Sequence, residues 1–250
     1  MRKQAKSVLE LGRSLGFAVS RGLQAKLSGQ ATISATCQIP QLREKYSALG
    51  LAPDTGVFVE VGAFDGETWS NTSFLADQGW RGVYVEPIPA YHARARARHL
   101  FNRVVAENVG IADTAGTAEI SVMGPLSTMN APTAELYNTI SWAQDASRAA
   151  TSQSIRTDRL ETVFQRNAIP HRFDLMVIDV EGGEQAIVAT LLQSAWRPRV
   201  MIVELIDRHS DFEGDASLQT SHREVRASLL ANGYREFYAD SINTIFTLEA

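Results

Sequence analysis

The sequence predicts an α/β domain built on a mostly parallel sheet, and two features of this 250-residue chain carry that prediction. From residue 57 onward, short apolar runs rich in β-branched residues alternate with helical patterns, as in a parallel sheet covered by helices on both faces. The last two runs, 234–239 and 242–248, are joined by a tight connection, which indicates an antiparallel strand. We therefore expect a seven-stranded, mostly parallel sheet with a C-terminal antiparallel strand.

The strands and helices of this domain can be placed in order along the chain. The earlier strands are expected at 57–61, 82–86, 103–109, 117–123, 173–179 and 200–205. The helices are expected at 42–49, 69–78, 89–100, 157–167, 183–193 and 219–232. The segments 124–150 and 207–218 are predicted to be largely loops, the first with a helix in its later part. Because loops above a rigid sheet usually carry specificity, they are our candidates for a lid and substrate walls.

Composition narrows the class of protein. The net charge of −4 argues against nucleic acid as a partner of the whole molecule. The single cysteine, Cys37, allows neither an internal disulfide nor a zinc cluster, and we expect it to be buried or partly buried. No apolar run reaches about 18 residues, the length that would indicate a transmembrane helix. We expect a cytoplasmic protein.

The N-terminal residues differ from the rest. We predict a basic extension and linker over 1–40, followed by the main α/β domain over 41–250. Residues 1–26 contain six basic residues and a single acidic one, Glu10. Apolar residues recur there at helical spacing and predict a cationic amphipathic helix. Such a helix can make peripheral contact with an anionic membrane or an acidic partner. The alternative, a solvated or packing helix, is the one we favour.

A glycine-bearing turn follows the first strand. The strand ends in Glu60-Val61-Gly62 and turns through Ala63-Phe64-Asp65-Gly66. Open α/β sheets bind ligands at the carboxyl ends of such strands. The spacing is E-x-G-x-x-x-G, not the G-x-G-x-x-G of a pyrophosphate site, and the acidic residues would repel a pyrophosphate. They suit a cationic centre such as a sulfonium or an ammonium, which argues against an NAD-dependent oxidoreductase.

Two of the acids have alternative interpretations. Glu86 ends the second strand, 20 residues after Gly66, where a carboxylate can accept hydrogen bonds from both hydroxyls of a ribose. The alternative is an exposed acid at a strand end. Glu60 could instead be a structural hydrogen-bond acceptor beneath the loop.

Several motifs in order resemble the FkbM-type methyltransferases. They are FVEVGAFDGET at 58–68 with SNT at 70–72, GWRG at 79–82 with EP at 86–87, NVGI at 108–111, TDRL at 157–160, IDVEGGE at 178–184 and NTIF at 243–246. The similarity spans roughly residues 56–247. The chain departs from the family at Phe64, where many members carry a small polar residue such as Asn, and at Gly183, where many carry Ala.

The resemblance implies a Rossmann-like class I methyltransferase that uses S-adenosylmethionine. Such enzymes are often O-methyltransferases of sugar hydroxyls, so the acceptor would be a glycan or a small secondary metabolite. The implied cofactor-binding residues are Glu60, Gly62, Ala63, Phe64, Asp65, Gly66, Ser70, Asn71, Glu86, Pro87, Ile88, Asn108, Val109 and Asp179. A catalytically inactive scaffold that still binds the cofactor is a further alternative.

An alcohol is a poor nucleophile at neutral pH, so its methylation needs a base or a metal ion. The candidates follow the fourth and fifth parallel strands. The catalytic candidates are Asp179, Glu181, Glu204 and His209, and the candidate ligands of a divalent metal are Asp179, Glu204 and Asp207.

These residues also have structural interpretations. Glu181 and Glu184 could simply favour a helix N-terminus through charge–dipole attraction. His209 could be an ordinary loop histidine. Arg94, Arg96 and Arg98 are expected to be solvated helix charges.

Overall fold

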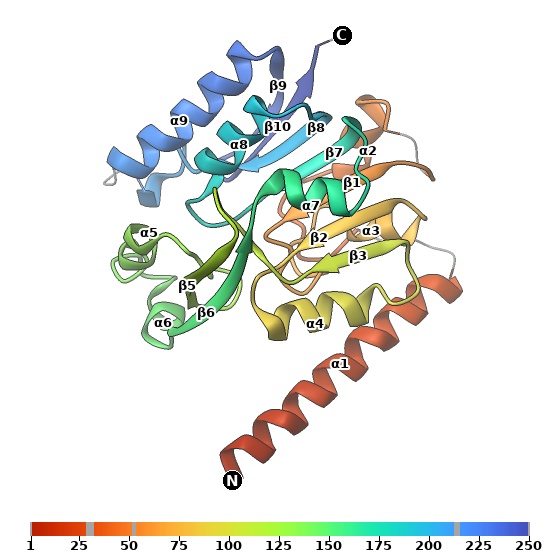
Figure 1. Cartoon of the computed structure of the whole chain (residues 1–250), viewed down its shortest axis with the longest axis vertical. Coiled ribbons are helices and arrows are strands. Elements are labelled where there is room, and N and C mark those ends of the chain that lie inside the picture. The colour runs from red at the N-terminus through yellow and green to blue at the C-terminus, as the bar shows by residue number, and fades with distance from the viewer. Residues whose placement is uncertain (1, 29–32, 52–53, 213–215, 250) are drawn as a thin grey trace. The chain divides into compact units, whose positions relative to one another are not determined.

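The computed structural model describes residues 2–28, 33–51, 54–212 and 216–249 (Figure 1). The chain divides into two compact units, one ending at Asn108 and the other beginning at Val109. The main sheet has seven strands in the order β3-β2-β1-β7-β8-β10-β9, and a smaller sheet has the order β4-β6-β5. The predicted α/β fold with a mostly parallel sheet is confirmed.

The first unit supplies three parallel strands of the main sheet. These are β1 (Val57–Val61), β2 (Arg81–Val85) and β3 (Val104–Glu107). Its helices are α1 (Arg2–Ser28), α2 (Leu42–Ala48), α3 (Ser73–Asp77) and α4 (Pro89–Arg98). Phe58 of β1 is fully buried. Its ring packs directly on the backbone of Gly82 in β2, where a Cβ would lie only 2.1 Å from the ring. The β1–β2 pair therefore packs closely.

The second unit supplies the other four strands of the main sheet. β7 (Arg172–Ile178) and β8 (Arg197–Glu204) are parallel, whereas β10 (Asn243–Leu248) is antiparallel to both β8 and β9 (Tyr234–Ala239). The smaller sheet consists of β4 (Gly110–Ile111), β5 (Gly116–Val122) and β6 (Thr151–Asp158). The helices are α5 (Ala131–Leu136), α6 (Gln144–Arg148), α7 (Leu160–Arg166), α8 (Glu184–Gln193) and α9 (Ala216–Ala231), with a short η1 at Ser210–Phe212. The apolar runs 175–178 of β7 and 200–203 of β8 are buried, as expected for parallel strands covered on both faces.

Two predicted helices start later than expected. The helix predicted over 69–78 forms only at Ser73–Asp77, because Trp69 takes a left-handed φ of 58° that cannot belong to an α-helix. The helix predicted over 157–167 starts at Leu160, because residues 151–158 pair with β5 as a long strand. Tertiary pairing overrides local helical pattern in this segment.

Across the described parts of the chain, we find no helix with both the length and the apolar character needed to cross a membrane. The predicted N-terminal helix is confirmed as α1. The predicted boundary near residue 40 stays a prediction.

The inner side of α1 packs closely on α4, beside which α1 lies in Figure 1. Gly22 is buried there, and a Cβ on it would lie 2.2 Å from the backbone oxygen of Arg98. Real Cβ atoms essentially never come within 3.0 Å of another atom, so this crossing requires glycine. One position thus fixes the approach of the extension to the domain.

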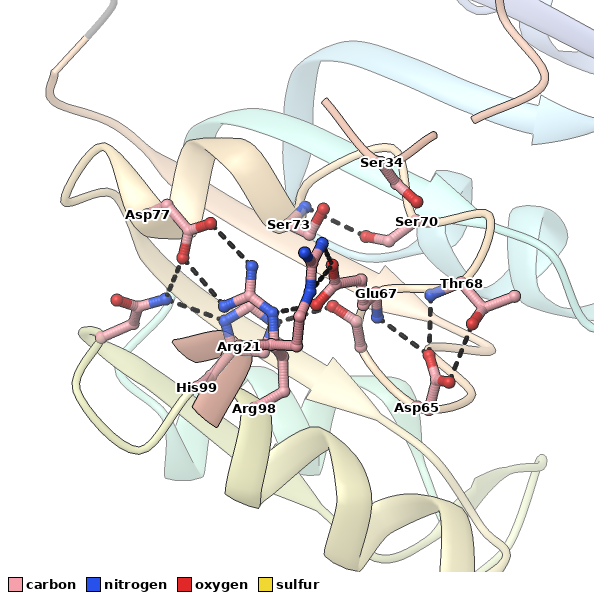
Figure 2. Close-up of polar contacts among 12 residues, drawn as sticks. Arg21, Ser34, Asp65, Glu67, Thr68, Ser70, Ser73, Asp77, Arg98 and His99 are labelled. Carbon is pink, nitrogen blue, oxygen red and sulfur yellow. Dashed lines mark hydrogen bonds and ion pairs between the residues drawn. The ribbon is translucent and has the colours of Figure 1, made fainter. Parts of the chain in front are cut away.

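Arg98 is the centre of a buried ionic network in the first unit, which Figure 2 shows. Only 5% of Arg98 is exposed. Its guanidinium donates two hydrogen bonds to the Asp77 carboxylate, at 3.0 and 2.7 Å, and its Nε donates to Glu67. Arg21 of α1 donates to the same Glu67 carboxylate. The expectation that Arg98 is a solvated helix charge is therefore wrong, because two acids from other segments surround it.

The network sets the charge of its members. Burial by itself would raise the pKa of Glu67, but the hydrogen bonds from Arg21 and Arg98 lower it below its usual value. Burial, together with the nearby charge of Arg98, lowers the pKa of His99 to about 4. His99 is therefore neutral at neutral pH, with its Nε2 2.7 Å from the backbone oxygen of Gly66.

We predict that Gly22→Ala will loosen α1 from the domain, because the new methyl group cannot fit against the Arg98 backbone. Trypsin should then cut faster at Arg21 and Lys26. Gly16→Ala is the matched control, since nothing lies within 4 Å of a Cβ at that position. It should raise helix stability by about 1 kcal/mol. Equal cleavage rates in the two variants would contradict the close contact.

A second prediction concerns the buried cation. Arg98→Ala leaves Glu67 and Asp77 without their shared partner, and removing one member of a buried pair costs roughly 3–5 kcal/mol. Urea denaturation should show a loss of unfolding free energy of that order. Arg96→Ala, which removes an exposed arginine of the same helix, should change the unfolding free energy by less than about 1 kcal/mol. Similar losses in both variants would argue against the network.

Candidate functional site

The turn after β1 depends on backbone conformations that glycine adopts without strain. Gly62 and Gly66 have φ values of 88° and 75°, and the Gly66 amide donates to the Ala63 oxygen at 2.8 Å. A Cβ on Gly66 would lie 3.1 Å from His99 and 3.2 Å from the backbone of Ala95. Glycine at 66 therefore lets the turn lie directly on α4.

Phe64 is also in the left-handed region, with φ of 48°. For most residues this conformation costs about 1–2 kcal/mol, and Asn tolerates it better because its short polar side chain hydrogen-bonds locally. Many members of the family that this chain resembles carry Asn at this position, and the left-handed backbone explains that preference. Here the Phe64 ring packs edge-on against Tyr91, with the ring centroids 4.5 Å apart, and this contact holds the loop in place.

The acidic side chains of the turn are occupied by local hydrogen bonds. Asp65 accepts from the amides of Glu67 and Thr68 at 3.0 and 2.7 Å, and from the Thr68 hydroxyl at 2.8 Å. Glu60 is 4% exposed and accepts from the hydroxyls of Ser70 and Thr72. Both carboxylates thus hold the loop in shape, which agrees with the structural interpretation of Glu60.

The segment 70–72 is linked to residues that precede the sheet. Tyr46 of α2 donates its hydroxyl hydrogen to the Asn71 backbone oxygen at 2.9 Å. The thiol of Cys37 lies 3.6 Å from the Asn71 side-chain oxygen and is partly buried, as expected. Burial, with the nearby Glu60 charge, raises the pKa of Tyr46 well above its usual range. Ser70 and Asn71, which the resemblance assigns to the cofactor, are thus held by contacts within the first unit.

Glu86 stands directly after β2 and is 5% exposed. Its two oxygens accept hydrogen bonds from the amides of Phe64 and Ile88, at 2.9 and 2.7 Å. The Asn108 amide group donates to the backbone oxygens of Glu86 and Pro87 at 3.0 and 2.9 Å. Five predicted cofactor residues of the first unit therefore form one connected group.

The Glu86 carboxyl is difficult to ionise in this environment. Burial raises its pKa from 4.5 to about 8, against the lowering effect of the two backbone hydrogen bonds. Each carboxylate oxygen has a second lone pair available, so Glu86 can accept further hydrogen bonds from hydroxyl groups. A ligand that supplies two such hydroxyls would favour the ionised form.

In the second unit, three predicted catalytic acids come together. Asp179 and Glu181 follow β7, Glu204 ends β8, and one carboxylate oxygen from each lies within 4.8 Å of the others. Asp179 and Glu204 are thus close neighbours, and two like charges at this separation favour a proton on one of the two carboxyls.

The environment of this acidic cluster favours protonation. Burial raises the pKa of Asp179 to about 6. Burial and the neighbouring acidic charges raise the pKa values of Glu181 and Glu204 well above their usual range. Such a group can take up a proton near neutral pH, and its three oxygen ligands also fit a hard divalent cation.

The segment 124–150, a predicted substrate wall, is hydrogen-bonded to the loop that carries Glu181. Tyr137 donates its hydroxyl hydrogen to Glu181 Oε2, and Thr128 donates to the Glu181 backbone oxygen at 2.6 Å. Asn130 donates to the Gly182 oxygen at 2.8 Å. Sequence reasoning did not single out these three residues. Asn130 had a detectable signal, since it precedes a proline-bearing helix start and caps α5.

Glu184 has the structural role considered for it. Its carboxylate accepts from the amides of Val180 and Gly182 at the start of α8. It also lies 3.3 Å from His222 Nε2. The other ring nitrogen of His222 accepts from the Ile206 amide, so Nε2 carries the hydrogen and donates to Glu184. Glu184 thus fixes the loop beside the acidic cluster.

The last two candidates, Asp207 and His209, are not among the three clustered acids. Asp207 is paired with Arg226 at 2.8 Å, and the triad that could hold a metal contains Glu181 in its place. His209 packs edge-on against Phe212, with centroids 5.3 Å apart, and its Nδ1 accepts from the Asp211 amide. The roles assigned to the site residues, including Val109 at the start of this unit, stay predictions.

Two solved structures resemble the fold of this chain. One is an O-methyltransferase from Bacillus cereus in complex with SAH, with a TM-score of 0.50 and 16% identity over 93% of this chain and 91% of that one. The other is a putative O-methyltransferase from Klebsiella pneumoniae, with a TM-score of 0.50 and 12% identity over 95% of this chain and 90% of that one. At these identities the likeness concerns the fold, and it agrees with the expected Rossmann-like methyltransferase class. No curated protein matches the sequence.

The family comparison is more specific. The model of the methyltransferase FkbM domain matches residues 60–236, well over half of the chain and most of the segment covered by the predicted motifs. This confirms the predicted enzyme class and is at odds with an NAD-dependent oxidoreductase. The chain belongs to the FkbM methyltransferase family.

Proposed function

We propose that this methyltransferase transfers a methyl group from S-adenosylmethionine to a sugar hydroxyl of a glycan or a secondary metabolite. The observation that carries the cofactor assignment is the Glu86 carboxyl, held after β2 by the amides of Phe64 and Ile88. A carboxylate at this point of an α/β sheet suits the two hydroxyls of a ribose. The turn 62–66 lacks the pattern of a pyrophosphate site, which favours a nucleoside without phosphates.

The reaction requires an oxygen nucleophile and an acceptor for its proton. The acceptor oxygen attacks the methyl carbon, the carbon–sulfur bond breaks, and the hydroxyl proton passes to a base. We assign that base to the acidic cluster of Asp179, Glu181 and Glu204, with Asp179 as the residue at the reacting centre. Tyr137 holds Glu181, which leaves the Asp179–Glu204 pair to exchange the proton.

The surroundings of the cluster support a sugar as the acceptor. The wall segments 124–150 and 207–218 share an apolar cluster that includes Tyr137 and Phe212. Trp142 packs beside both, is 52% exposed, and donates from its indole to Asp211 at 2.8 Å. An exposed aromatic face beside carboxylates matches the apolar ring faces and hydroxyl edges of a sugar.

The acceptor class can be tested with labelled S-adenosylmethionine and a panel of monosaccharides, oligosaccharides, peptides and RNA. We expect label in an alkali-stable methyl ether of a sugar. Transfer to nitrogen or carbon would overturn the O-methyltransferase assignment. Turnover of peptides or RNA with no turnover of any sugar would overturn the sugar assignment. Cofactor binding without any turnover would favour the inactive-scaffold alternative.

We predict that Glu86→Gln will weaken S-adenosylmethionine binding about 10- to 100-fold, since hydrogen bonds to a charged acceptor are worth roughly 1.5–3 kcal/mol. The pH dependence follows from the sign of the shift. The Glu86 pKa is raised to about 8, so the free protein holds the proton below that pH and must release it to bind. Affinity of the wild type should therefore rise with pH up to about 8, whereas Glu86→Gln should show no such rise.

Isothermal calorimetry across this pH range measures both effects. Asp113→Asn is the control, because it removes an exposed acidic charge and should leave affinity and its pH dependence unchanged. Binding of NAD, with no heat from S-adenosylmethionine, would refute the cofactor assignment.

We also predict that Asp179→Asn will lower kcat about 10²- to 10⁴-fold, the usual contribution of general acid–base catalysis. Affinity for S-adenosylmethionine should change little. Asp174→Asn, on the same strand β7, is the control and should keep its turnover. Full turnover of Asp179→Asn would exclude Asp179 as the base. A loss of affinity for S-adenosylmethionine with unchanged kcat would instead make Asp179 a cofactor-binding residue.

The same assay should be repeated in EDTA. We expect turnover to persist, since the proposed base needs no metal. Loss of turnover that Mg²⁺ restores would assign the acidic cluster to a divalent cation instead.

A further inference from the structure

The N-terminal helix α1 has two faces with different surroundings. Its inner face packs on α4 through the buried Gly22. On the rest of the helix, Phe17, Leu23 and Leu27 are 69%, 42% and 78% exposed. We propose that these three residues, with the exposed cation Arg13 on the same face and the exposed Lys26 beside it, form a lipid-docking face that binds an anionic bilayer surface.

The attachment of α1 to the domain is what keeps this lipid-docking face outward. Gly22 allows a close approach to the Arg98 backbone, and Arg21 is bound to Glu67. Rotation of the helix about its axis would break both contacts. The apolar side chains therefore cannot turn toward the core, although removing their surface from water would be favourable. A partner outside the chain can supply that burial.

The charge of this helix identifies the kind of partner. Within residues 1–28 the basic residues are Arg2, Lys3, Lys6, Arg13, Arg21 and Lys26, and the single acid is Glu10. The whole chain carries −4, so positive charge is concentrated at this end. Apolar residues interleaved with cations on one helix face are typical of helices that lie in the plane of a membrane surface. Anionic lipids attract such segments by about 1 kcal/mol for each Lys or Arg.

A bilayer fits this face better than a second copy of the chain. Association of two lipid-docking faces would bring the basic residues of both copies together, and like charges repel. The helix would lie on the surface and not cross it, in agreement with the finding that no described helix suits a membrane span. A surface-bound helix needs only one apolar face, and α1 has one such face free.

The test uses the full-length protein and sedimentation with two kinds of vesicle, phosphatidylcholine alone and phosphatidylcholine with phosphatidylglycerol. We expect binding to the anionic vesicles only, weakening as salt is raised. The double variant Phe17→Ser with Leu27→Ser should lose binding at least about tenfold, because the apolar contact is removed. Leu230→Ser, at an exposed leucine of α9, is the matched control and should bind as the wild type does.

A second pair of variants separates charge from apolar contact. Arg13→Gln with Lys26→Gln should weaken binding about 30-fold, since two surface charges near an anionic bilayer contribute about 2 kcal/mol. Arg103→Gln with Arg235→Gln removes two exposed arginines elsewhere and should have no such effect. Circular dichroism and the melting temperature check that every variant stays folded.

The opposing outcomes are distinct. The proposal is overturned if the wild type binds neither kind of vesicle, or if the control variants lose binding as much as the α1 variants do. Sedimentation velocity tests whether a second copy of the chain occupies this face instead. A wild-type dimer that binds no vesicles, and that dissociates in the double variant Phe17→Ser with Leu27→Ser, would assign the face to self-association.

Discussion

A buried cation organises the first unit. Arg98 is the last residue of α4, and its charge neutralises Glu67 and Asp77, which lie on two other segments. Without it, two carboxylates would sit in a poorly solvated environment, a cost that packing alone does not offset. The turn after β1, the end of α3 and the C-terminal part of α1 all meet at this guanidinium, directly or through Glu67. The geometry of the glycine-bearing turn therefore depends on a residue more than thirty positions away.

The acidic side chains of the two turns that follow β1 and β7 have different surroundings. In the first unit, Glu60 and Asp65 are saturated by hydroxyl and amide donors and serve the loop. In the second unit, Asp179 and Glu204 face each other, and their nearest acidic neighbours make the ionised state costly. The first kind of carboxylate fixes the shape of the loop, whereas a carboxylate crowded by other acids can exchange a proton. Perturbed carboxyls of the second kind are the ones expected where proton transfer takes place.

The backbone explains why the site sequence has its particular residues. Phe64 and Glu181 both adopt left-handed conformations, and each lies in a turn that follows a buried parallel strand. Glu181 is followed by Gly182, where a Cβ would lie 2.3 Å from the Thr133 hydroxyl. The hydrogen bonds that Tyr137 and Thr128 donate to Glu181 stabilise its strained backbone conformation. The segment 124–150 and the loop that carries Glu181 are thus connected by hydrogen bonds in the second unit.

The strands of the main sheet, the order of the motifs and the family resemblance were predictable from the sequence, because buried parallel strands are continuous apolar runs and the motifs are local. Glu86 could be named as a candidate ligand for the same reason, since it stands directly after such a run. The strand at 151–158 was not predictable, because it is polar and forms through pairing with β5. The burial of Arg98, the hydrogen bond from Tyr137 to Glu181 and the pairing of Asp207 with Arg226 became apparent only in the folded chain. These contacts join residues distant in sequence, and a charged side chain carries no local signal of whether it meets water or an opposite charge.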